Sequence, residues 1–262
     1  MDLLGRVVVV TGAAQGIGAA LARRFAAEGA AGVVVSDVNL DGARAVAADI
    51  AAAGGAAIAV HADVSRKDDL QALVASTRAY FGPVDLFCSN AGVAFGTGIH
   101  ASGQQWETSW AVNVMQHVHV AQSVLPDMIR RGGGHLLVTA SAAGLLGAPG
   151  DAPYTVSKHA VVGLAEWLAV TYRPRGIGVS ALCPLGVRTA LLEPGIAAGH
   201  PTALAIAALA PLLTPEEVAE SAVQGLRKEE FLILPHESVR ATYAAKARDV
   251  DAWIDRTIAG GH

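Results

Sequence analysis

The sequence predicts an α/β fold in which helices cover both faces of a doubly wound parallel sheet. Two observations support this prediction. Short β-branched apolar runs alternate along the chain with longer segments whose apolar residues recur at helical spacing. A glycine-rich turn joins the first of these runs directly to the first helical segment. At 262 residues the chain is long enough for one large core, and we expect a single domain over 1–262.

Composition and charge favour a globular α/β protein over a nucleic-acid-binding or membrane-spanning one. Hydrophobic residues make up 52% of the chain and aromatic residues only 5%, so small aliphatic side chains dominate, as suits helices packed closely on a sheet. The net charge is −4 without blocks of like charge, which argues against a nucleic-acid partner. The longest mildly apolar stretch, 196–213, contains Pro201 and Pro211, so no membrane span is expected.

The first residues, the cysteines and the histidines argue against a secreted, disulfide-bonded or metal-binding protein. Residues 1–6 lack the charged and apolar regions of a signal peptide. Cys88 and Cys183 lie near the carboxyl ends of different predicted strands, and we expect free thiols and a reducing, cytoplasmic location. His117 and His119 are two residues apart and diverge around a helix. They are expected to serve packing or an interface, and no metal site is predicted.

The first unit of the chain is a strand, a glycine turn and a helix. Val7–Val10 form a β-branched run typical of a parallel strand buried on both faces, and residues 17–27 read as a helix. Gly12 allows the tight turn, Gly16 lets a pyrophosphate approach the backbone, and Gly18 lets the helix pack closely on the strand. The helix N-terminus then offers unpaired N–H groups to phosphate. The turn could be purely structural, but its position between strand and helix favours a nucleotide.

The second strand, 32–37, ends in an acidic residue, Asp37. A carboxylate about twenty residues after a glycine turn can accept hydrogen bonds from both hydroxyls of an adenosine ribose, and it would repel the extra phosphate of NADP. No Arg or Lys occupies 36–40 or directly precedes Gly16. The sequence therefore predicts NAD as cofactor. Asp37 could instead, or also, cap the helix expected over 41–53.

The middle of the chain supplies two further strands, 56–61 and 84–88. A helix over 67–81 separates them, because its apolar residues recur at helical spacing and Gly82-Pro83 ends it. Asp63 follows the third strand, where it could cap this helix. The fourth strand leads into Ser89-Asn90-Ala91-Gly92.

The second half continues the alternation of helix and strand. Residues 104–131 read as one or two helices before a Gly132–Gly134 turn. The remaining expected elements are strands over 135–140, 177–182 and 231–235 and helices over 152–172, 215–227 and 238–258.

Tyr154 and Lys158 stand four residues apart in the predicted helix over 152–172, so they lie on one face, a turn apart. A free tyrosine titrates near pH ~10 and is a poor base at neutral pH. A lysine ammonium within a few ångströms favours the phenolate and lowers its pKa. The pair can therefore act as an acid–base device for a hydroxyl proton.

The motifs converge in space. In an open α/β sheet, ligands bind outside the carboxyl ends of the strands. The motifs at 12–18, 37, 63, 89–92 and 141 all follow predicted strands. We therefore expect them to meet at one edge of the sheet.

These motifs, in this order, resemble the short-chain dehydrogenase/reductase superfamily in its single-domain form, over about residues 1–235. The resemblance implies a Rossmann-type sheet of seven parallel strands and NAD-dependent interconversion of an apolar secondary alcohol and its ketone. It implies that Tyr154 is the general acid/base, that Lys158 tunes it and binds the nicotinamide ribose, and that Ser141 hydrogen-bonds the substrate oxygen. The amide of Asn113 would hold a water that links the lysine to solvent; the alternative is a buried amide that joins helix turns.

The resemblance also implies a set of cofactor contacts. Asp63 would contact the adenine amino group, Val64 would flank the ring, Asn90 would stabilise the sheet, and Val187 and Thr189 would hold the carboxamide. The full implied set is Gly12, Gln15, Gly16, Ile17, Gly18, Asp37, Asp63, Val64, Asn90, Ala91, Gly92, Tyr154, Lys158, Pro184, Gly186, Val187 and Thr189.

The chain departs from the family pattern in places. Ser89 stands where the family usually has Asn, and Leu185 stands where Gly usually follows the proline. An apolar lid over the substrate is expected at 190–213, and a helical tail at 238–259 could cover the pocket or a neighbouring subunit. A homodimer or homotetramer is implied by resemblance. The alternatives are an NADP-dependent carbonyl reductase and a catalytically silent nucleotide-binding relative.

Overall fold

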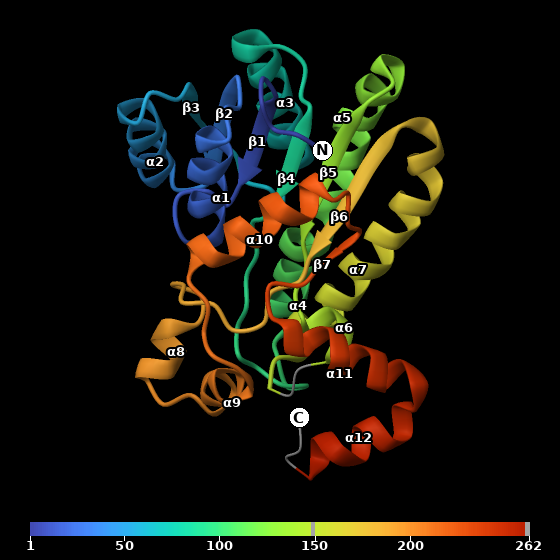
Figure 1. Cartoon of the computed structure of the whole chain (residues 1–262). Helices are drawn as coiled ribbons and strands as arrows, with labels where there is room; N and C mark the ends of the chain where they lie inside the picture. Colours follow the sequence, from blue (N-terminus) through green and yellow to red (C-terminus); the bar gives the residue numbers. More distant parts are fainter. Residues whose placement is uncertain (148–149, 260–262) are drawn as a thin grey trace.

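The computed structural model describes residues 1–147 and 150–259. Its described residues form one parallel sheet of seven strands in the order β3-β2-β1-β4-β5-β6-β7 (Figure 1). This confirms the predicted doubly wound sheet. The strands are β1 Val7–Thr11, β2 Gly32–Asp37, β3 Ala57–His61, β4 Leu86–Ser89, β5 Gly134–Thr139, β6 Ile177–Leu182 and β7 Leu232–Ile233.

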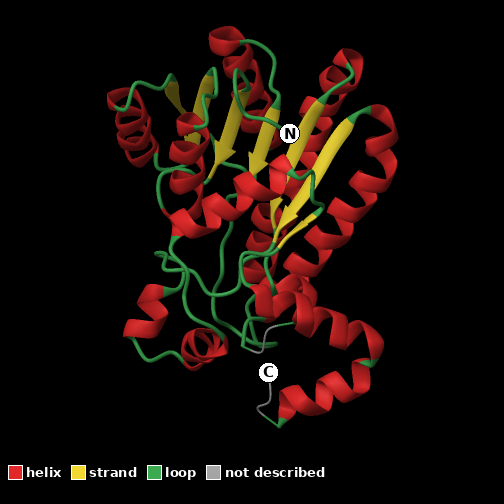
Figure 2. Ribbon diagram, in the orientation of Figure 1, coloured by secondary structure: helices red, strands yellow, loops and turns green. Residues whose placement is uncertain are grey.

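Helices cover both faces of the sheet (Figure 2). A π-helical segment, Ala111–Met115, joins α4 to α5, and a 3₁₀ turn, Arg173–Arg175, follows α7. The α-helices are α1 Gly16–Ala27, α2 Leu40–Ala52, α3 Lys67–Phe81, α4 Gly103–Trp110, α5 Gln116–Arg131, α6 Ala143–Leu146, α7 Ala152–Tyr172, α8 Glu193–Ala197, α9 Pro201–Leu209, α10 Pro215–Arg227, α11 Glu237–Arg248 and α12 Val250–Ile258.

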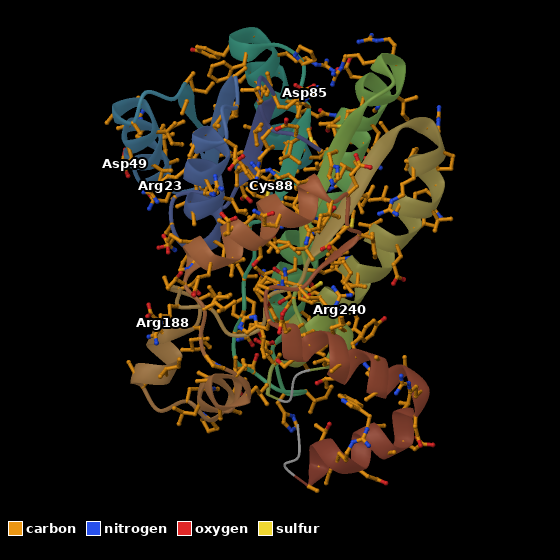
Figure 3. The ribbon with its side chains drawn as sticks, viewed as in Figure 1. Arg23, Asp49, Asp85, Cys88, Arg188 and Arg240 are labelled. Carbon is orange, nitrogen blue, oxygen red and sulfur yellow. The ribbon has the colours of Figure 1, made fainter. Side chains whose placement is uncertain are left out.

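The β-branched runs of the sequence build two apolar cores, one on each face of the sheet. Successive side chains of a strand point to opposite faces. Val9 and Val34 accordingly pack in the core covered by α3, α5 and α7. Val8 and Val33 pack in the core covered by α1, α2 and α10. At the surface, an ion pair between Arg23 and Asp49 links α1 to α2 (Figure 3).

The strand order reverses between β1 and β4, which are neighbours in the sheet. A crevice at the carboxyl ends of the strands is expected at such a switch point. The α8, α9, α11 and α12 helices lie beyond this edge, away from the main body of the sheet (Figure 1). The loops after β1, β4, β5 and β6 leave the sheet at this edge, on the side where these helices lie.

The predicted continuous helix over 238–258 is wrong, because the segment forms two helices that meet at Asp249. The backbone of Asp249 is extended (φ −153°, ψ 98°), and its carboxylate accepts a hydrogen bond from the Ala252 N–H to cap α12. The Lys246 Nζ atom donates to the Leu145 carbonyl at 2.6 Å. The tail therefore contacts α6 of its own chain, close to the carboxyl end of β5.

Two further expectations can be compared with the structure. Cys88 lies in β4 and Cys183 follows β6; both are buried free thiols, and β5 separates their strands. Within residues 1–147 and 150–259, no helix is both long and apolar enough to cross a lipid bilayer.

Candidate active site

The glycine turn after β1 leaves no room for larger side chains. Gly12 has a left-handed backbone (φ +62°), and a Cβ atom there would lie 2.6 Å from the Ala91 Cα. A Cβ on Gly18 would lie 2.1 Å from the Gly12 carbonyl oxygen. The side chain of Gln15, the N-cap of α1, does not cap the helix, so it leaves the first N–H groups of Gly16 and Ile17 available. This cradle fits a pyrophosphate, which needs close backbone approach and free donors.

Asn90 joins three strands at this edge. Its Nδ2 atom donates to the carbonyls of Thr11 at 3.0 Å and Gly12 at 3.2 Å, and its Oδ1 atom accepts from Thr139 Oγ1 at 3.1 Å. The Thr11 hydroxyl accepts from the Asn90 N–H at 3.0 Å. These bonds connect β4 with β1 and β5, as expected for Asn90, and hold Ala91 and Gly92 beside the glycine turn.

The two acidic residues after β2 and β3 organise their own loops. The Asp37 carboxylate accepts from the N–H groups of Ala14 at 3.0 Å and Asn39 at 2.8 Å. Asn39, and not Asp37, caps α2. Asp63 accepts from the N–H and hydroxyl of Ser65 and does not cap α3. The helix-cap alternatives for both carboxylates are therefore wrong, and Asp37 remains beside the glycine turn, where a ribose is expected.

Tyr154, Lys158 and Ser141 meet at the carboxyl end of β5. The Lys158 ammonium donates to the Thr139 carbonyl at 2.9 Å and lies 5.5 Å from the centre of the Tyr154 ring. The Ser141 hydroxyl lies near the Tyr154 phenol and acts to lower its pKa. A Cβ on Gly92 would lie 3.6 Å from the Lys158 Nζ atom, so the loop after β4 closes over the lysine. Three of the four side chains predicted as catalytic, all but Asn113, thus share one site.

Burial dominates the protonation of this pair. It raises the pKa of Tyr154, which the hydrogen bond from Ser141 partly offsets, and it lowers the pKa of Lys158 to about 8. The sequence-based expectation was the opposite direction for Tyr154. A phenolate surrounded by protein atoms loses hydration energy, so burial favours the neutral phenol.

Asn113 lies in the π-helical segment and hydrogen-bonds both the loop after β4 and the α7 helix. Its Oδ1 atom accepts from the Val93 N–H at 2.9 Å, and its Nδ2 atom donates to the Val93 carbonyl at 2.9 Å and to Ser157 Oγ at 3.0 Å. Both N–H groups of the amide are therefore engaged by protein. The structure gives Asn113 the structural role of a buried amide, although it joins a loop to α7 and not only helix turns, and its role in a water relay remains a prediction.

The segment Pro184–Thr189 follows β6 and is tied to the expected lid. Val187 pairs with Leu213, and Thr189 Oγ1 donates to the Val187 carbonyl at 3.3 Å. At the unusual Leu185, the backbone N–H donates to His236 Nδ1 at 3.2 Å. Arg188 lies at the foot of this lid, near α8 (Figure 3). The lid segment itself forms two short helices, α8 and α9.

Three site residues were missed by the sequence-based reasoning. Gln116 is fully buried and donates to the carbonyl of Ala91, His236 supports Leu185, and Asp151 caps α7 beside Tyr154. Only Asp151 had a signal in the sequence, since Asp-x-Pro is a helix-start pattern. By contrast, His117 is buried, and burial lowers its pKa to about 3, which agrees with a packing role.

The fold and the geometry of this edge are those of a Rossmann-type oxidoreductase. Residues 6–197 match the family model for short chain dehydrogenases. The chain belongs to this family.

Known relatives agree with this assignment. The chain is 38% identical over 202 residues to 1-deoxy-11-beta-hydroxypentalenate dehydrogenase of Streptomyces exfoliatus, covering 74% of this chain and 71% of the relative. It is 38% identical over 196 residues to 2,5-dichloro-2,5-cyclohexadiene-1,4-diol dehydrogenase of Sphingobium indicum, covering 73% and 76%. A crystal structure of a short chain dehydrogenase/reductase from Burkholderia phymatum in complex with NAD superposes with a TM-score of 0.86 at 32% identity, covering 96% of each chain.

Proposed function

We propose that the protein is an NAD-dependent dehydrogenase that interconverts an apolar secondary alcohol and its ketone. The observation that carries the proposal is the meeting of Tyr154, Lys158 and Ser141 beside the glycine cradle of α1. These groups supply a proton donor and acceptor, a cation and a hydroxyl at the place where a nicotinamide is expected. A catalytically silent relative would have no use for this arrangement.

Asp37 supports NAD over NADP. Its carboxylate ends β2 beside the glycine turn and is held by two backbone N–H groups. Ribose hydroxyls can donate to it, whereas a phosphate would be repelled. The remaining cofactor contacts are proposed as the resemblance implies them, from Gly12 to Gly18, from Asn90 to Gly92, and at Asp63, Val64, Pro184, Gly186, Val187 and Thr189.

The acid–base step depends on the protonation of Tyr154. During oxidation its phenolate accepts the hydroxyl proton of the alcohol, while Ser141 donates a hydrogen bond to the same oxygen. Below its pKa of about 8, Lys158 provides a positive charge beside the ring. A nicotinamide bound here would supply the hydride chemistry at the alcohol carbon. Because burial raises the pKa of Tyr154, oxidation should accelerate as pH rises, and the neutral phenol is ready to protonate a ketone at neutral pH.

The walls of the site favour an apolar substrate. Phe95 follows β4 and is 37% exposed, and the lid at 190–213 contributes Ile206 and Leu212, whose side chains lie against Gly186. The two named relatives act on a hydroxypentalenate and a chlorinated cyclohexadienediol, according to their names. We therefore place the substrate among apolar cyclic or branched secondary alcohols.

We further propose a cytoplasmic homodimer or homotetramer of single-domain chains. Apolar side chains on α7, the helix that carries the catalytic pair, remain exposed: Val156 by 48%, Trp167 by 58% and Val170 by 80%. A second copy would remove this surface from water. The two free thiols fit a reducing compartment.

The first test is a rate assay that follows reduced nicotinamide absorbance with apolar secondary alcohols, offering NAD and NADP separately. Tyr154→Phe should lower turnover by about 100-fold or more while NAD binding stays unchanged, because only the acid–base group is lost. Tyr80→Phe is the matched control, since Tyr80 is 70% exposed on α3. Retained activity in Tyr154→Phe would contradict the proposed acid–base role, and a preference for NADP would contradict the role of Asp37.

A further inference from the structure

The loop between β4 and α4 crosses the site without regular secondary structure. It carries Val93 and Phe95 along the expected substrate wall. Its first part is held by Asn113, which bonds both the N–H and the carbonyl of Val93. Its next part is held by an independent group, the carboxylate of Asp151.

The Asp151 carboxylate sits at the junction of this loop with the catalytic helix. Its Oδ2 atom accepts from the N–H groups of Phe95 at 2.8 Å and Gly96 at 2.7 Å. Its Oδ1 atom accepts from the Tyr154 N–H at 3.0 Å, which caps α7. A fourth bond closes the junction, from the Ala152 N–H to the Thr97 carbonyl at 3.0 Å.

The loop is shaped for this anion. Gly96 has a left-handed backbone (φ +65°), and the consecutive N–H groups of Phe95 and Gly96 converge on one oxygen, a concave arrangement that binds anions. The N-terminus of α7 adds a third donor and a positive dipole end. Asp151 is 5% exposed, so these bonds are shielded from water. A charge-assisted bond of this kind is stronger than a neutral one.

We propose that Asp151 is a positioning residue that fixes the Phe95–Thr97 segment of the substrate wall to the start of the catalytic helix. The inference rests on the proposed function for its catalytic meaning. It goes beyond that function by assigning one carboxylate to two tasks. The carboxylate aligns Tyr154 with the wall that holds the substrate, and its negative charge opposes formation of the Tyr154 phenolate.

The effect of the Asp151 charge on the Tyr154 phenol can be separated from the effects of the other groups around it. Asp151 raises the pKa of Tyr154, as does Cys183 after β6, whose own pKa burial raises to about 12. Lys158 lies on the same helix, and the His200 ring from the lid lies against Gly96. Asp151 is thus the carboxylate that acts on the phenol at neutral pH, and its neutralisation should favour the phenolate.

Two variants separate the tasks. Asp151→Asn removes the charge and keeps the shape, while Asp151→Ser keeps an acceptor for the Tyr154 N–H but does not reach the loop. In both variants, hydrogen exchange of the peptide over 93–97 should accelerate by about 10-fold or more, since two shielded bonds weaken. The KM for the alcohol should rise by a similar factor, with NAD affinity unchanged. Asp249→Asn, the same change at the N-cap of α12, is the matched control and should alter neither.

The charge effect is measured without turnover. Ultraviolet titration of the phenolate, taken as the difference between each protein and its Tyr154→Phe counterpart, isolates Tyr154 from the other three tyrosines of the chain. The pKa of Tyr154 should fall in Asp151→Asn, because the negative charge that opposes the phenolate is removed. Unchanged exchange at 93–97, or an unchanged Tyr154 titration, would overturn the inference. A wild-type protein inactive with every alcohol would overturn the proposed function alone, because the exchange and titration experiments would still decide the role of Asp151.

Discussion

The proposed nucleotide side and the proposed substrate side of this molecule are built in opposite ways. On the nucleotide side, α1 buries six of its residues, and its first turn approaches β1 so closely that only glycine fits at Gly18. On the substrate side, α8 and α12 bury none of theirs, and α9 and α11 bury one each, Ala203 and Val239. Cofactor geometry therefore depends on backbone packing, whereas the substrate wall rests on a few contacts that can change at little cost in stability.

The largest difference in stability should appear when a methyl group is added to one glycine on each side of the molecule. In Gly18→Ala the new Cβ would meet the Gly12 carbonyl oxygen at 2.1 Å and the Asn90 amide nitrogen at 2.6 Å. Backbone cannot yield as a side chain does, so we expect a loss of about 3 kcal/mol or more in free energy of unfolding, and loss of NAD binding. Gly98→Ala on the substrate side, where a Cβ meets nothing within 4 Å, should change stability by under about 1 kcal/mol.

Denaturant unfolding and NAD titration of the two variants measure the contrast. Similar losses in both would show that the two sides do not differ in packing tolerance.

Lys158 sharpens the comparison, because a buried catalytic group should weaken the fold that holds it. Its pKa falls from 10.5 to about 8 in the folded protein, so the unfolded chain binds the proton more tightly. Folding is therefore penalised below pH 8, and the penalty disappears as pH rises towards 10.5. The pKa shift corresponds to a penalty on folding of about 3 kcal/mol. A substitution that removes the ammonium also loses its hydrogen bond to the Thr139 carbonyl, which contributes about 1 kcal/mol.

Lys158→Met should accordingly be more stable than the wild type at pH 7, by roughly 1–3 kcal/mol, and inactive. The gain should vanish above pH 10.5. Urea unfolding at several pH values checks both the sign and the pH range. A less stable Lys158→Met at pH 7 would show that the ammonium contributes to the fold and does not strain it.

The same contrast explains what the sequence could reveal. The glycine turn, the Tyr154–Lys158 pair and the strands of β-branched residues were predicted because their signals are local. The clamps at Asn113 and Asp151 join segments 20 and up to 56 residues apart, and nothing in one segment indicates its partner. The raised pKa of Tyr154 depends on burial, which spacing alone does not give. The break at Asp249 was missed because apolar spacing continues across it.

The smallest effect on stability should come from Trp253 on α12. The Lys246 ammonium lies 4.8 Å from the centre of the Trp253 ring and also donates to the Leu145 carbonyl. A Cβ on Gly147 would lie 3.7 Å from this ring, so Trp253 touches the segment that follows Ser141. Trp253→Ala should cost under about 1 kcal/mol in stability, because one partly exposed cation–π contact is lost.

Its effect on the substrate should be larger than its effect on the fold. With Trp253 gone, the segment after α6 loses a wall, and the KM for bulky alcohols should change by about 3-fold or more while that for small alcohols stays constant. Ile258→Ala is the matched control, since Ile258 lies on the same helix and is 79% exposed. If Trp253→Ala unfolded the protein, α12 would be an essential part of the fold. If it left every KM unchanged, α12 would have no role at the site. In either case the proposed division between a rigid nucleotide side and an adaptable substrate side would not extend to the C-terminal helices.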